Sequence, residues 1–79
     1  MTMNKAPFIK MLNIMEERAN ERWPAMYNLM QYKAVKEILN KEAHTITYAE
    51  KEVVRESMRA MCLALGLDYY RLLQKVYQK

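Results

Sequence analysis

The chain has one glycine and two prolines among its 79 residues. A β-rich domain of this length needs many more of these residues to make its turns. Good helix formers dominate the rest of the sequence: Leu, Met, Ala, Glu, Lys, Arg and Gln. The sequence therefore predicts an all-α fold, a small bundle of four helices in a single domain that covers residues 1–79.

Length and cysteine content limit how such a bundle can be stabilised. A chain of this size buries only about 60–65% of the surface that it exposes when unfolded, and its one cysteine cannot form an internal disulfide. The hydrophobic residues, 52% of the chain, must therefore pack efficiently or find a partner chain. The longest apolar run, residues 60–67, is far shorter than the ~20 residues that span a bilayer. We expect a cytoplasmic protein with no targeting segment and no membrane association.

Two helices are expected in the first half of the chain. The first covers residues 6–22, with Pro7 in its first turn, and ends at Trp23, because a residue before proline disfavours the helical conformation. A kinked, continuous helix is the alternative. The second begins near Pro24 and ends at about Asn40, before a loop over residues 40–46. The core-facing stripe of the first helix is Phe8, Leu12, Met15 and Ala19, and that of the second is Tyr27, Met30, Ala34 and Ile38.

Two further helices are expected in the second half. Thr47 and Glu50 have the spacing of a capping box, in which each side chain accepts a hydrogen bond from the other residue's backbone N–H. The third helix begins there and ends before Gly66, which suits the left-handed conformation of a helix C-terminus. Asp68 is a good N-cap for the fourth helix. The residues of the fourth helix that are expected to face inward are Tyr69, Leu72, Leu73 and Val76.

Residues with catalytic or metal-binding chemistry are few. His44 is the only histidine and falls in the loop, whereas Cys62 is the only cysteine and falls on a core stripe. One such pair cannot make an ordinary metal site unless carboxylates supply the other ligands, and one glycine cannot make a phosphate-binding loop. We interpret Cys62 as a small buried hydrophobe and His44 as a solvated loop residue. We therefore expect no enzymatic activity, no metal and no cofactor.

The corner between the third and fourth helices carries the most specific pattern in the chain. The pattern has a small residue four positions before a glycine, an aliphatic and a capping residue after it, and apolar residues six and ten positions beyond it. Around Gly66 these positions are occupied by Cys62, Leu67, Asp68, Leu72 and Val76. With this spacing, residues 62–77 resemble the helix-turn-helix of the Fis family and related bacterial and phage regulators. The resemblance implies that the fourth helix binds DNA, although the third helix is longer than the first helix of that motif.

The DNA-binding hypothesis names a set of residues on the fourth helix. Arg71 and Gln74 can bond base edges, Lys75 can lie on phosphates, and Leu73 on the same helix is a poor reader of bases. The full predicted set is Tyr69, Tyr70, Arg71, Gln74, Lys75 and Lys79. A second basic row on the third helix consists of Lys51, Arg55 and Arg59. The net charge of +4 and the isoelectric point of about 9.3 permit a nucleic-acid partner without requiring one.

The alternative is a helical protein–protein adaptor or inhibitor. Residues 60–67 are apolar all around their helix, and such a helix is buried on every side, here by a partner chain. The predicted partner interface is Met61, Leu63 and Leu67. The eight methionines suit an adaptable binding face, and filling of the core is the other explanation for them. A homodimer agrees with both hypotheses, because helix-turn-helix proteins commonly bind DNA as dimers.

Overall fold

The computed structural model describes residues 3–77 and consists of helices and their connections. Within those residues there is no strand, so the prediction of a small all-α bundle of four α-helices is confirmed. Two short 3-10 helices, η1 and η2, interrupt the connections. In chain order the elements are α1 (Ala6–Arg22), η1 (Pro24–Asn28), α2 (Met30–Leu39), η2 (Ala43–Thr45), α3 (Tyr48–Ala64) and α4 (Tyr69–Tyr77).

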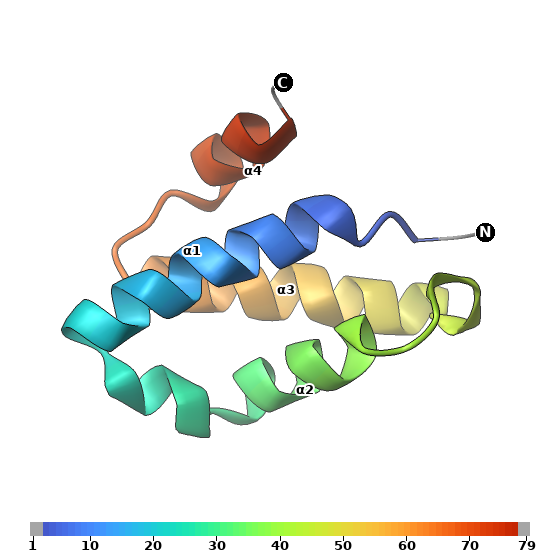
Figure 1. Ribbon diagram of the computed structural model, residues 1–79, viewed down its shortest axis with the longest axis horizontal. Helices are drawn as coiled ribbons and strands as arrows, with labels where there is room; N and C mark the ends of the chain where they lie inside the picture. The colour runs from blue at the N-terminus through green and yellow to red at the C-terminus, as the bar shows by residue number, and fades with distance from the viewer. Residues whose placement is uncertain (1–2, 78–79) are drawn as a thin grey trace.

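The helices pack as two pairs that share one core. α2 packs along α3, and α4 packs mainly on α1 and less extensively on α3. In Figure 1, α1 and α3 occupy the middle of the molecule, with α2 on one side and α4 on the other. Between residues 3 and 77, every helix lacks the length or the hydropathy that crossing a membrane requires.

The first helix has the predicted bounds and the predicted buried face. It spans Ala6–Arg22 with Pro7 in its first turn, and it ends at Trp23, whose φ of −150° and ψ of 70° are not helical. The Asn4 side-chain oxygen accepts a hydrogen bond from the Ala6 N–H at 3.2 Å. All four residues of the predicted stripe are buried: Phe8, Leu12, Met15 and Ala19.

The second predicted helix is wrong as a continuous element. Residues 24–28 form η1, Leu29 is extended with ψ of 140°, and α2 begins only at Met30. The break changes the phase of the helix, so Met30 is 83% exposed and not in the core. The buried residues of α2 are Tyr32, Val35, Ile38 and Leu39.

Two tyrosines connect this broken segment to α1. The Tyr32 hydroxyl donates to Glu16 Oε2 at 2.6 Å, and the Tyr27 hydroxyl lies 2.8 Å from Asn20 Oδ1. The two rings meet edge to face with centroids 5.1 Å apart. Burial, and then the neighbouring Glu16 carboxylate, raise the pKa of Tyr32 well above its usual range. The polar ends of both tyrosines are therefore satisfied where the chain turns between α1 and α2.

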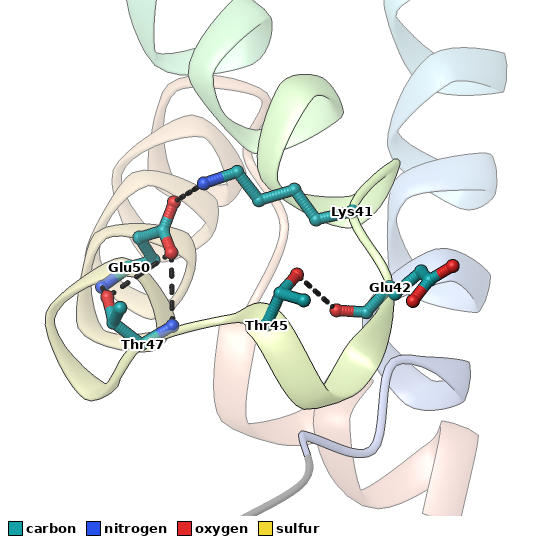
Figure 2. Close-up of polar contacts among 5 residues, drawn as sticks. All are labelled: Lys41, Glu42, Thr45, Thr47 and Glu50. Atoms are coloured by element: carbon teal, nitrogen blue, oxygen red, sulfur yellow. Dashed lines mark hydrogen bonds and ion pairs between the residues drawn. The ribbon is translucent and has the colours of Figure 1, made fainter.

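The start of α3 is the capping box that the sequence predicts (Figure 2). The Glu50 N–H donates to Thr47 Oγ1 at 3.1 Å, and the Thr47 N–H donates to Glu50 Oε1 at 3.0 Å. The Lys41 ammonium donates to the other oxygen of the same carboxylate. The hydrogen bonds from Lys41 and from the Thr47 backbone hold the pKa of Glu50 below its usual value. One carboxylate thus caps α3 and attaches the loop that precedes it.

A lysine side chain closes the C-terminal end of α2. Lys5 Nζ donates to the backbone oxygens of Leu39 at 3.1 Å and of Lys41 at 2.7 Å. Carbonyls at a helix C-terminus lack partners within the helix and carry a partial negative charge, so a cation suits them. The residue that precedes α1 therefore also holds the end of α2.

The core is rich in sulfur. Of the seven methionines among residues 3–77, six are buried: Met3, Met11, Met15, Met26, Met58 and Met61. Cys62 is fully buried among them, with its Sγ 3.6 Å from Met15 Sδ. Unbranched methionine side chains can fill the irregular space between helices that cross. The explanation of these methionines as core filling is confirmed for the described residues, and a Met-rich exposed face is wrong for them.

We expect Thr47→Ala to lower the free energy of unfolding by about 1 kcal/mol, because the first turn of α3 loses its side-chain cap. Urea denaturation followed by circular dichroism measures the change. Thr45→Ala is the matched control, since the Thr45 hydroxyl donates to the Glu42 carbonyl in η2 and caps no α-helix. Equal losses in the two variants would contradict a specific role for the cap.

Candidate nucleic-acid interface

The corner between α3 and α4 is built by backbone hydrogen bonds at the end of α3. The Leu67 N–H donates to the Cys62 carbonyl at 2.8 Å, and the Gly66 N–H donates to the Leu63 carbonyl at 3.1 Å. This pair of bonds is the Schellman motif, and Gly66 adopts its left-handed conformation with φ of +75°. A Cβ at Gly66 would meet no atom within 4 Å, so backbone conformation and not space favours glycine here. The predicted end of the third helix is confirmed.

Asp68 begins the next helix as predicted. Its Oδ1 accepts a hydrogen bond from the Arg71 N–H at 3.2 Å, and its carbonyl accepts one from the Leu72 N–H at 2.9 Å. The carboxylate also lies at the positive end of the α4 dipole. Residues 65–68 therefore contain both the stop of α3 and the start of α4, which fixes how α4 leaves the corner.

The inner face of α4 rests on the bundle through partly buried side chains. The residues in contact with the core are those that the sequence predicts to face inward: Tyr69, Leu72, Leu73 and Val76. None of the residues of α4 is fully buried. Burial raises the pKa of Tyr69 above its usual value. Tyr69, which was also predicted as a DNA contact, is therefore partly buried against the bundle.

The outer face of α4 presents the other predicted contacts to solvent. Tyr70 is 60% exposed, and Arg71, Gln74 and Lys75 are exposed as well. Within residues 3–77, neither Arg71 nor Lys75 forms an ion pair. Lys79, the last residue of the predicted set, lies outside the described residues.

One long edge of α4 faces α3 and carries mixed charge. The Arg59 guanidinium lies over the Tyr70 ring, 5.5 Å from its centroid, and Tyr69 meets Tyr70 edge to face. Arg55 of the predicted basic row pairs with Glu52 at 3.1 Å. The hollow along this edge is lined by Glu52, Arg55, Glu56, Arg59, Tyr69, Tyr70 and Leu73. Its cations are thus balanced by neighbouring acids or placed against an aromatic ring.

The other long edge of α4 faces α1 and is cationic. A shallow hollow there is lined by Lys10, Asn13, Ile14, Lys75 and Val76. A second hollow is lined by Leu67, Asp68, Arg71, Leu72 and Lys75. Sequence reasoning missed Lys10, because nothing in the spacing of residues 6–22 and 69–77 indicates that α1 and α4 pack together.

An apolar patch lies beside the corner. Leu63 is 80% exposed, and it shares a hollow with Leu67 and Tyr70. Met61, predicted as part of a partner interface, is only 2% exposed and belongs to the core. Met61 has the spacing of the core stripe of α3 and Leu63 lies off that stripe, and the structure leaves Leu63 outside while Met61 is inside. The predicted interface is therefore reduced to Leu63 and the half-buried Leu67.

His44 and Cys62 do not share a site. His44 lies on the surface in η2, with Nε2 3.4 Å from Glu42 Oε2. Cys62 is fully buried against Met15. Among residues 3–77, no group of three or more His, Cys, Asp and Glu side chains could hold a metal ion.

Comparisons with protein families, with curated proteins and with solved structures returned no match to this chain.

We expect the Cys62 thiol to resist modification in the folded protein. Burial raises its pKa to about 11, so at pH 8 about 0.1% of the thiol is ionised, and the thiolate is the reactive form. Labelling with a chromogenic disulfide reagent at pH 8 should be slow in buffer and complete at once in concentrated guanidinium. Native labelling as fast as that of free cysteine would contradict the burial of this side chain.

Proposed function

We propose that this protein is a small, non-enzymatic cytoplasmic regulator that binds DNA through the outer face of α4. The observation that supports the proposal best is the exposure of Arg71, Gln74 and Lys75 on a helix that has no acidic residue and no ion pair within residues 3–77. Exposed cations that no protein carboxylate neutralises are available to phosphates.

The chemistry of these side chains suits a helix in the major groove. Arginine bonds guanine edges and glutamine bonds adenine edges, whereas lysine contacts phosphates without reading sequence. α4 spans residues 69–77, about 13 Å at the usual rise, and a single α-helix fits the major groove. Arg71 lies in the first turn and Lys75 one turn later, so the first suits a base edge and the second suits the backbone.

The resemblance to a helix-turn-helix supports the same proposal over a limited part of the chain. Gly66 and Asp68 have the conformation and the capping role that the motif needs. α3, at 17 residues, is longer than the first helix of the motif, so the similarity is confined to residues 62–77.

We expect Arg71→Ala and Lys75→Ala to weaken DNA binding in different ways. Loss of Arg71 should cost about 1–3 kcal/mol on a preferred sequence and relax sequence preference, because a base contact is lost. Loss of Lys75 should weaken binding to all DNA sequences by the same factor, and it should flatten the dependence of log affinity on log salt by about one unit.

Fluorescence anisotropy with duplexes selected from a random library, at several salt concentrations, measures both effects. Lys33→Ala is the control, since Lys33 is an exposed lysine of α2, and α2 and α4 lie on opposite sides of α1 and α3 in Figure 1. Affinity that is independent of salt, or that is the same in all three variants, would contradict DNA binding through α4.

The second candidate function is protein binding through the corner patch, with another copy of the chain as the first partner to test. The observation that favours it is the exposure of Leu63 beside Leu67 and Tyr70. Full burial of a leucine side chain yields about 1.5–3 kcal/mol, so a partner that covers this patch gains affinity from it. A homodimer formed there is compatible with DNA binding, because α4 keeps Arg71 and Lys75 on its other edge.

We expect the protein to be a dimer at micromolar concentration and Leu63→Lys to be a monomer, as measured by sedimentation equilibrium. Val53→Lys is the matched control, since Val53 is a partly exposed apolar residue nearer the start of the same helix. A monomeric wild-type protein would rule out the dimer. A complex with a different protein that is lost in Leu63→Lys, together with no DNA binding, would favour the adaptor function.

A further inference from the structure

We infer that Lys10 of α1 and Lys75 of α4 together form a contact site for the phosphate backbone of DNA. The inference rests on the proposed function and adds to it an element, α1, and a residue that lie outside the helix-turn-helix pattern. The two lysines are far apart in the sequence and meet at one hollow where α4 packs on α1.

The composition of this hollow suits a phosphate. Lys10, Lys75 and Asn13 are exposed, while the half-buried Ile14 and Val76 form the apolar part of the lining. No carboxylate lines the hollow, and within residues 3–77 neither lysine forms an ion pair. Two ammonium groups and an amide can all donate hydrogen bonds to the oxygens of an anion. An anion between the lysines also relieves the repulsion of two like charges.

The hollow continues into the proposed DNA-binding face. Lys75 also lines the neighbouring hollow, which contains Arg71. The one acid there, Asp68, accepts a hydrogen bond from the α4 backbone as its cap. Lys10, Lys75 and Arg71 therefore follow one edge of α4, next to the exposed Gln74. A helix that lies in the major groove is flanked by the sugar–phosphate backbone. The cationic edge of α4 is therefore placed to contact phosphates. The edge that faces α3 is less suited to them, because Glu52 and Glu56 lie there.

The test compares three variants that each remove one positive charge: Lys10→Gln, Lys75→Gln and, as control, Lys33→Gln. Duplex affinity is measured from 50 to 150 mM salt. Lys10→Gln and Lys75→Gln should each flatten the slope of log affinity against log salt by about one unit. Raising the salt from 50 to 150 mM should therefore reduce the affinity of each variant about threefold less than it reduces the affinity of the wild-type protein. Lys33→Gln should keep the wild-type slope. Lys10→Arg, which retains the positive charge, should also keep the wild-type slope. Circular dichroism checks that each variant retains its helices.

The outcomes separate this inference from the function on which it rests. Wild-type DNA binding with a steep salt slope, together with an unchanged slope in Lys10→Gln, overturns the phosphate site and leaves binding through α4 in place. Equal flattening in Lys10→Gln and Lys33→Gln also overturns it, because net charge alone then explains the effect. Wild-type protein that shows no salt-dependent DNA binding overturns the proposed function, and the phosphate site with it.

Discussion

The contact between Met15 of α1 and Cys62 of α3 joins the two helices on which α2 and α4 pack. Both side chains are fully buried, and their sulfur atoms are 3.6 Å apart. A chain of 79 residues without a disulfide has little surplus stability, so a void at this contact would be costly. Flexible methionines of α1, η1 and α3 fill other parts of the same core. α2 packs on α3 and α4 packs mainly on α1, so α2 and α4 lie on opposite sides of these two helices (Figure 1).

The parts of the fold that the sequence predicts well are those that depend on local chemistry. Thr47 and Glu50 accept hydrogen bonds from each other's backbone N–H groups within one turn, and Gly66 adopts a left-handed conformation that is unfavourable for other residues. Both ends of α3 are therefore predictable from the sequence. The break at Leu29 has no such signal, because a leucine flanked by Asn28 and Met30 is compatible with a helix. Contacts of Tyr27 and Tyr32 with α1 accompany the break, and such contacts between distant segments are not encoded in a local pattern.

The candidate site is likewise predictable only where it depends on the local periodicity of a helix. The outward position of Tyr70, Arg71 and Gln74 follows from the period of α4 alone. The assignment of Met61 to a partner interface is wrong, because Met61 has the helical spacing of the core stripe with Val54 and Met58 and is buried with them. Lys10 could not be found at all without the structure, because its closeness to Lys75 arises when the first and last helices meet.

The absence of any fully buried residue in α4 has a consequence for the energy of opening that helix. Local unfolding costs least where few apolar groups leave the core, and α4 has only partly buried ones. Detachment of α4 leaves the buried contacts among α1, α2 and α3 intact, including the Lys5 bridge to the end of α2. Amide hydrogens of α4 should therefore exchange with solvent through local opening, whereas those of α3 require global unfolding. A ligand that binds α4 only while α4 is packed on the bundle would stabilise this packing. Binding of the ligand would therefore be detected as slower amide hydrogen exchange in residues 69–77.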